Sequence, residues 1–112
     1  VWGSGQQYRD FIHVEDVVRG IRIMMDEGMN QGLIQIGSGI ATSIRDLAET
    51  IIEISGKNII ARFTSEMPEG DRGRIADPSL AKDKLGWEAQ IGLKQGLIRT
   101  YQWIEVQMAC AK

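Results

Sequence analysis

Residues 9–28 read RDFIHVEDVVRGIRIMMDEG, and this stretch contains the two patterns from which the fold is predicted. Its first six residues, Arg9 to Val14, predict a short strand. Apolar residues then recur at helical spacing, and Gly28 supplies a helix stop, so residues 15–27 are expected to form an amphipathic helix. The residues expected to face the core from this helix are Val14, Val17, Val18, Ile21, Met24 and Met25.

The next segments predict a strand, a helix and a second strand. Leu33 to Ile36 is a short apolar run between glycines and is expected to be a buried strand. Ser43 followed by Asp46 resembles a capping box, and the apolar residues behind it predict a helix that ends at Gly56. Asn58 to Phe63 is rich in isoleucine and predicts another strand, expected to pair in parallel with the first.

The last third of the chain predicts a loop and two helices. Residues 64–74 have no apolar periodicity and are expected to form a loop. Asp77-Pro78 predicts the start of a short helix that ends at Gly86. Apolar residues from Leu93 onward predict a closing helix that frays after Gln107, and the tryptophans Trp87 and Trp103 are expected to be packing residues.

Together these segments predict a mixed α/β fold, with a short, partly parallel sheet and about four helices. We expect residues 1–112 to form a single lobe. Its expected parts are a turn and strand at 1–14, a helix-strand-helix-strand segment at 15–63, and a loop with C-terminal helices at 64–112.

The composition excludes several classes of protein. A length of 112 residues with 43% hydrophobic residues suffices for one core. Thirteen basic against 15 acidic residues give a net charge of −2, so no general positive field attracts nucleic acid or an anionic membrane. The lone Cys110 forms no intrachain disulfide, and no apolar run or signal peptide indicates a membrane or secreted protein, so a cytoplasmic location is expected.

Two arginine-containing segments are candidates for binding an anion. Gly3 and Gly5 precede Arg9, and a guanidinium beside flexible backbone suits a pyrophosphate. The segment Gly70-Asp71-Arg72-Gly73-Arg74 places two arginines in a glycine-containing loop. The alternatives are a surface ion pair between Arg9 and Asp10, and a solvated surface loop.

The turn Gly37 to Thr42 nearly matches the pattern G-x-G-x-x-G/A that holds a phosphate at the start of a helix. Glu66 lies where an acid would bind a ribose. A small NAD-binding module is therefore one interpretation. The alternatives are a tight strand-to-helix turn and a turn that borders a substrate.

Other catalytic and metal sites have little support. His13 is the only histidine, so a histidine metal site is excluded and a structural role is favoured. Neither Tyr8 nor Tyr101 has a lysine four residues later to lower its pKa. We therefore predict no catalytic, metal or hydride-transfer residues in this chain.

In order and spacing, several motifs resemble the C-terminal part of the NAD-dependent epimerase/dehydratase family, the extended short-chain dehydrogenases that act on nucleotide sugars. The motifs are Val1-Trp2-Gly3-Ser4-Gly5, Arg9 to Asp16, Ile36-Gly37-Ser38-Gly39, Ser43-Ile44, Lys84-Leu85-Gly86-Trp87 and Gly96-Leu97. Within the family, Pro68-Glu69-Gly70, Arg72-Gly73-Arg74, Asp77 and the tail from Lys94 to Ile104 look most like the GDP-mannose 3,5-epimerase group.

This resemblance implies a nucleotide-sugar binding lobe of an extended Rossmann-type enzyme. Arg9 is then expected to bind the substrate diphosphate, and the loop Gly70, Asp71, Arg72 and Arg74 is expected to border it. The family's cofactor fingerprint and Tyr-x-x-x-Lys pair lie in an N-terminal half that this sequence lacks. NAD is thus the cofactor of the parent enzyme and not of this chain.

The resemblance also implies partners. These are a nucleotide-sugar substrate, the missing N-terminal cofactor domain and, through the open edges of Leu33 to Ile36, a second copy in a homo-oligomer. The alternatives are an independent interaction or structural domain from a truncated gene, and the small NAD-binding module described above.

Overall fold

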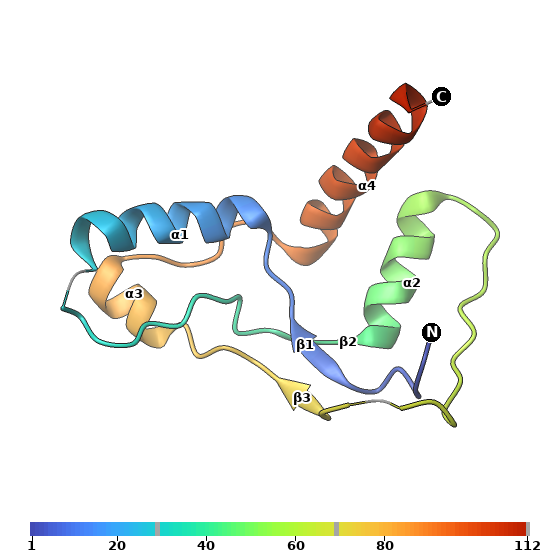
Figure 1. Ribbon diagram of the computed structural model, residues 1–112, viewed down its shortest axis with the longest axis horizontal. Coiled ribbons are helices and arrows are strands. Elements are labelled where there is room, and N and C mark those ends of the chain that lie inside the picture. Colours follow the sequence, from blue (N-terminus) through green and yellow to red (C-terminus); the bar gives the residue numbers. More distant parts are fainter. Residues whose placement is uncertain (29, 69, 112) are drawn as a thin grey trace.

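The computed structural model describes residues 1–28, 30–68 and 70–111 and has a mixed α/β fold (Figure 1). The fold class agrees with the prediction, because the described residues form a small sheet and four helices. In chain order the elements are β1 (Tyr8–Asp10), α1 (Val14–Glu27), β2 (Ala41–Ser43), α2 (Ile44–Ser55), β3 (Gly73–Arg74), α3 (Ser79–Leu85) and α4 (Leu93–Cys110).

The sheet has the strand order β2-β1-β3, with β1 in the centre. β1 pairs antiparallel with β2, so that Arg9 faces Thr42. It pairs in parallel with β3, and this register places Arg9 beside Arg74. The sheet therefore brings together the two arginine-containing segments that the sequence marked as candidates.

Two of the predicted strands were wrong. Residues 33–36 and 58–63 are extended chain without assigned strand structure, so their predicted parallel pairing is absent from the described residues. A strand needs a hydrogen-bonded neighbour, and neither segment has one with the required register. The parallel pair lies instead between β1 and β3, and a single bridge joins Trp2 to Thr64.

The helices follow the sequence pattern more closely. The Ser43 hydroxyl accepts a hydrogen bond from the Asp46 amide at 2.9 Å, which caps α2 as predicted. Gly56 and Gly86 end their helices with φ of 62° and 58°, the left-handed conformation that favours glycine.

Two helix ends differ from the prediction. Helix α3 begins at Ser79, with Pro78 as its N-cap residue, and the Asp77 carboxylate accepts from the Ser79 amide at 3.0 Å. Helix α4 continues to Cys110 instead of fraying after Gln107.

The core lies where α1 crosses α3. Ala81, Leu85 and Trp87 are buried, and Ile12, Ile23, Met24, Ile34 and Ile36 pack against them. Gly20 permits this crossing, because a Cβ there would lie 2.6 Å from the Ile36 side chain and 3.0 Å from Trp87 Nε1. The prediction that Trp87 is a packing residue is confirmed.

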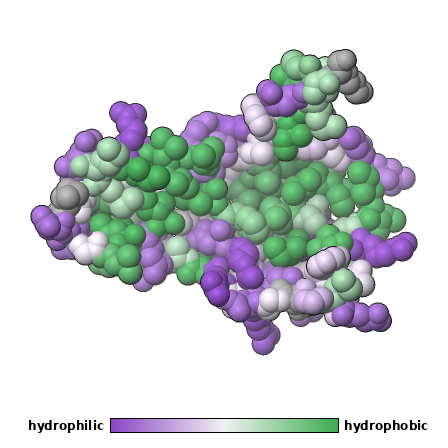
Figure 2. All heavy atoms as spheres, viewed as in Figure 1, coloured by the Kyte–Doolittle hydropathy of each residue, from purple (hydrophilic) through white to green (hydrophobic). Residues whose placement is uncertain are grey.

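Much of the expected core stripe of α1 is exposed. Val14, Val18, Ile21 and Met25 have exposed fractions of 66%, 51%, 46% and 73%, and Trp103, predicted to pack, is 63% exposed. Figure 2 shows wide hydrophobic areas on the face in view, over the α1 end of the molecule and towards α2 and α4. None of the helices in the described ranges combines the length and the apolar character needed to cross a bilayer.

Candidate functional site

A hollow of about 350 Å³ lies beside the sheet and is lined by both Arg9 and Arg74. Asp10, Gln35, Gly37 and Ala76 also line it. Arg9 and Arg74 are partners in the β1–β3 register, although like charges side by side repel each other. Such a pair is favourable when an anion lies between the two guanidinium groups, so the site suits an anionic ligand.

Asp71 interacts with both arginines. The Arg9 guanidinium donates to the Tyr8 carbonyl at 2.7 Å and to the Asp71 carbonyl at 3.1 Å. The Arg74 guanidinium forms an ion pair with the Asp71 carboxylate. The side chains of Asp71 and Arg74 are 56% and 78% exposed, so this ion pair is within reach of a competing anion.

The other described residues of the predicted loop contribute through backbone conformation and backbone hydrogen bonds. The Arg72 carbonyl accepts from the Tyr8 amide at 3.0 Å, while Arg72 itself is exposed and is not among the residues lining the hollow. Gly70 has φ of 71°, a turn conformation that suits glycine. Gly73 lies flat against Tyr8, where a Cβ would overlap the ring, and Glu69 lies outside the described residues.

The sequence did not mark Asp10 as a site residue, yet its carboxylate is the most connected group at the hollow. Oδ1 accepts from the Ser38 amide at 2.8 Å and from the Ser38 hydroxyl at 2.6 Å. Oδ2 accepts from the Gly39 amide at 2.9 Å and from the Ala76 amide at 3.3 Å. Burial raises the pKa of Asp10, but these hydrogen bonds outweigh burial and hold the pKa below its ordinary value of 3.8.

The glycine-rich turn therefore binds a carboxylate of the chain itself. The amides of Ser38 and Gly39, which the NAD-module interpretation would give to a phosphate, donate to Asp10. Gly37 is required by this packing, because a Cβ there would lie 2.4 Å from the Ala76 Cβ and 2.6 Å from Asp10 Oδ2. The geometry matches the tight-turn interpretation, with the turn bordering the hollow.

Asp16, in the first turn of α1, performs a similar role. It is 1% exposed, and it accepts from the Gln90 amide at 3.0 Å, the Ile91 amide at 2.8 Å and the Arg19 guanidinium at 2.6 Å. Burial raises the pKa of Asp16, but the hydrogen bonds from Ile91, Arg19 and Gln90 lower it below the ordinary value. Asp16 lies outside the arginine hollow and fixes the segment that leads into α4.

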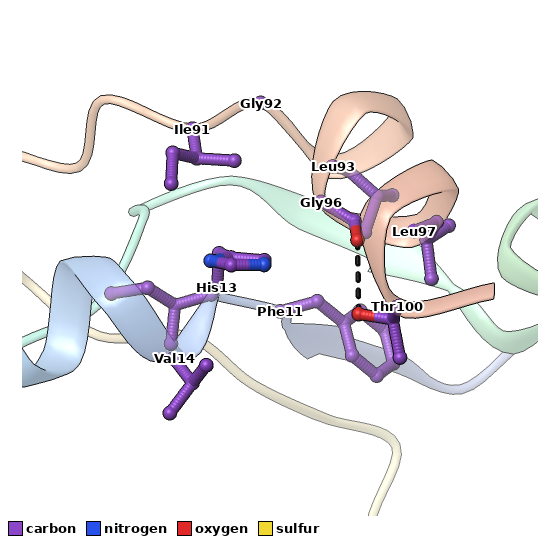
Figure 3. Close-up of a pocket in the computed structure, with 10 residues that line it drawn as sticks. Phe11, His13, Val14, Ile91, Gly92, Leu93, Gly96, Leu97 and Thr100 are labelled. Carbon is purple, nitrogen blue, oxygen red and sulfur yellow. Dashed lines mark hydrogen bonds between the residues drawn. The ribbon is translucent and has the colours of Figure 1, made fainter. Parts of the chain in front are cut away.

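A second hollow, also of about 350 Å³, lies between His13 and the first turns of α4 (Figure 3). Phe11, Ile91, Leu93 and Leu97 make it mostly apolar. Two of its polar groups have partners within the chain: His13 Nδ1 accepts from the Glu15 amide at 3.3 Å, and the Thr100 hydroxyl donates to the Gly96 carbonyl at 2.9 Å.

His13 is thus the N-cap residue of α1, which confirms the structural role predicted for it. Within the part of the chain that the structure describes, no group of three or more His, Cys, Asp or Glu side chains is arranged to hold a metal ion. The arginine hollow is the candidate site, because its two guanidinium groups suit an anionic ligand.

Comparisons with known proteins agree with the fold and motifs. Residues 1–100 match the family model described as GDP-mannose 4,6 dehydratase. The chain is 32% identical over its full length to probable GDP-L-fucose synthase 1 of Oryza sativa subsp. japonica, of which it covers 34%. It is 34% identical over 96% of its length to the GDP-mannose 3,5-epimerase of Arabidopsis thaliana, of which it covers 28%.

Solved structures give the same result. UDP-glucose 4-epimerase of Thermotoga maritima, crystallised with UDP-glucose, superposes with a TM-score of 0.89 at 33% identity, over 96% of this chain and 35% of that one. The enzyme WbmF of Bordetella bronchiseptica, in complex with NADH, superposes with a TM-score of 0.83 at 35% identity, over 96% of this chain and 32% of that one. This chain thus spans about a third of the length of these enzymes.

The family model covers nearly the whole chain, and relatives with different enzyme names match the chain about equally well, so the family is resolved while the closest member is not. The chain belongs to the GDP-mannose 4,6 dehydratase family, within the NAD-dependent epimerases and dehydratases that act on nucleotide sugars.

Proposed function

We propose that this chain is the nucleotide-sugar binding lobe of an NAD-dependent epimerase or dehydratase and is not catalytic on its own. The observation that carries the proposal is the placement of Arg9 and Arg74 side by side at one hollow. Two guanidinium groups offer a fixed positive charge and several N–H donors, which suits the two phosphates of a nucleotide diphosphate. The whole of residues 1–112 serves as this one lobe.

Asp71 is the internal counter-ion that the ligand replaces. It already neutralises Arg74, and its carbonyl accepts from Arg9. A diphosphate carries more charge than one carboxylate and therefore competes well for both arginines. Gly70 provides the turn that precedes residues 71–74. Arg72 is exposed outside the hollow and adds positive charge to the same segment.

The substrate class is a nucleoside diphosphate hexose, and the GDP-sugars are the first candidates. The family model and both relatives described above carry GDP-sugar names, whereas the superposed epimerase was crystallised with UDP-glucose. The motifs at residues 68–77 and 94–104 favour a resemblance to GDP-mannose 3,5-epimerase. GDP-mannose is therefore the first ligand to test, and UDP-glucose is the comparison.

NAD and a cofactor-binding domain belong to the parent enzyme in this proposal. WbmF is an example of a related enzyme that holds NADH. The exposed side chains Val14, Val18, Ile21 and Met25 on α1 provide an apolar face that such a domain would cover. Without it, the same face promotes association of two copies of this chain.

A titration of the 112-residue chain followed by NMR tests the proposal. GDP-mannose is expected to shift the amide signals of residues 9, 10 and 74–76 at millimolar or lower concentration, and the Arg9→Ala variant is expected to lose this response. Arg22→Ala is the matched control, because Arg22 is an exposed arginine of α1 that lies outside the hollow. The proposal is wrong if neither GDP-mannose nor UDP-glucose shifts these signals, or if both variants lose the response equally.

An independent interaction domain is the second candidate function, and the exposed apolar face of α1 favours it. In that case the chain would bind a protein through Val18 and Met25 and would have no affinity for nucleotide sugars. The same titration separates the two functions, because only the nucleotide-sugar lobe responds to the ligand.

A further inference from the structure

We propose that Asp10 is the positioning residue of the arginine site, and that its carboxylate sets the separation between Arg9 and Arg74. This inference rests on the proposed function for the identity of the ligand. Its structural part stands on the hydrogen bonds of Asp10.

Strand β3 is too short to fix the position of Arg74 by itself. It consists only of Gly73 and Arg74, and its pairing with β1 extends from Tyr8 to Arg9. A two-residue strand has too few ladder hydrogen bonds to hold a side chain rigidly. The next residue of β1 is Asp10, and its Oδ2 accepts from the Ala76 amide, two residues beyond Arg74. The side chain of Asp10 thus links β1 to the segment after β3, beyond the point where the backbone pairing of the two strands ends.

Asp10 also holds the opposite wall of the hollow. The same carboxylate accepts from the Ser38 and Gly39 amides and from the Ser38 hydroxyl, so the Gly37–Gly39 turn is fixed to β1 as well. Gly37 brings this turn against Ala76, at a distance that leaves no space for a Cβ. One carboxylate therefore joins three segments of the hollow: β1, the glycine turn and the chain after β3.

Three of the four groups that donate to Asp10 are backbone amides, and they converge on an ionised, partly buried oxygen pair. Replacing one oxygen by an NH₂ group places a donor against donors, whichever way the amide turns. Asp10→Asn therefore keeps the volume of the side chain but is expected to displace the glycine turn, the segment at Ala76 or both.

Asp16 provides a matched control. It is also a carboxylate with a lowered pKa that accepts from two backbone amides, but those amides belong to Gln90 and Ile91 and do not line the arginine hollow. Asp16→Asn is expected to lower stability at least as much as Asp10→Asn. A purely structural role for Asp10 predicts the same effect on ligand binding from both variants.

The experiment measures the affinity of the full chain for inorganic pyrophosphate and for GDP-mannose by calorimetry, at a temperature where both variants are folded. Asp10→Asn is expected to weaken both affinities by roughly tenfold, the effect of leaving charged hydrogen bonds unmade. Asp16→Asn is expected to leave them within about twofold. Equal losses in the two variants, or no loss in Asp10→Asn, would overturn the inference.

A second variant and a second readout test the role of Asp10 if the first experiment fails. If Asp10→Asn does not fold, Ser38→Ala removes one of the four hydrogen bonds while keeping the carboxylate, and a loss of affinity of about threefold is expected. If the wild-type chain binds neither probe, the proposed function fails, and the Nε–Hε NMR signals of Arg9 and Arg74 test the positioning role directly. They are expected to shift in Asp10→Asn and to stay in place in Asp16→Asn; unchanged signals in Asp10→Asn would refute the inference.

Discussion

At the scale of single residues, two aspartates connect segments that are far apart in the chain. Asp10 joins β1 to the glycine turn and to Ala76, and Asp16 joins the start of α1 to Gln90 and Ile91. Each carboxylate is ionised and receives several N–H donors, which makes it a strong acceptor. The sequence motif from Arg9 to Asp16 thus carries both connections within eight residues.

The lowered pKa values of these aspartates predict that the chain loses stability in acid. Their pKa values lie below 3.8 in the folded state and rise on unfolding, so the unfolded chain binds more protons. The stabilisation is therefore complete above about pH 5 and is lost as the pH falls through the folded pKa values. Chemical denaturation at a series of pH values measures this loss.

Asp16→Asn is expected to be less stable than the wild type by about 2–4 kcal/mol at neutral pH and to depend less on pH between about pH 5 and 2. The variant has lost a carboxylate whose pKa changes on unfolding. An unchanged slope of stability against pH in this variant would contradict the account of Asp16.

Trp87 is the residue on which the core depends most. It has no exposed surface, and its Nε1 donates to the Asp16 carbonyl at 3.1 Å. Trp87→Phe is expected to cost about 1–3 kcal/mol, because the hydrogen bond to the Asp16 carbonyl is lost and the smaller ring fills less of the core, and Trp87→Ala about 3–5 kcal/mol. Thermal unfolding of both variants measures the difference, and Trp103→Phe, at an exposed position, is the control expected to change little.

At the scale of secondary structure, the helices were predictable and the strands largely were not. Helix signals are local, and the apolar spacing of α1, the Ser43 cap and the glycines at 56 and 86 are all read within a few residues. β2 and β3 have two or three residues each and exist because β1 lies between them. Their partners lie more than 30 residues away, so a local pattern does not identify them.

The residues of the candidate site were also only partly predictable from the sequence. Arg9, Arg74 and the glycine loop could be found from residue type and motif, whereas Arg72 could not be separated from Arg74 until the register of β3 was known. The sequence does not reveal the role of Asp10, because three of its four donors are the backbone amides of residues 38, 39 and 76, which leave no residue-specific signal. Glycine at position 37 was the available clue, since a close approach excludes a side chain there.

The cap of α2 gives a prediction for one element. Ser43→Ala removes the acceptor for the Asp46 amide and is expected to destabilise the chain by about 1 kcal/mol. Hydrogen exchange is expected to increase most in the first turn of α2. Ser43→Asp, which restores an acceptor, is expected to recover most of the loss, and failure to recover would argue against the capping role.

At the scale of the whole molecule, the chain leaves much apolar surface uncovered. Figure 1 shows α1 and α4 diverging from the region of the sheet, and the outer residues of α1 are exposed. The described residues include only three buried apolar side chains, and a chain with so small a core and such a face is expected to associate with another protein surface.

Self-association is the corresponding prediction for this chain alone. Light scattering is expected to show a mass above that of a monomer that rises with concentration, and Val18→Glu is expected to shift the population towards monomer. Asn58→Asp adds the same charge at an exposed polar position and is the control. A strict monomer at high concentration would contradict the prediction.

The central claim is that Arg9 and Arg74 hold a diphosphate, and a calorimetric comparison of GDP with GMP tests it most directly. The two ligands differ by one phosphate, so their difference in affinity isolates the contribution of the diphosphate. We predict that GDP binds about tenfold or more tightly than GMP and that this preference disappears in Arg9→Ala and in Arg74→Ala but persists in Arg72→Ala. Equal affinities for GDP and GMP in the wild type, or a preference that survives the loss of Arg9, would contradict the account.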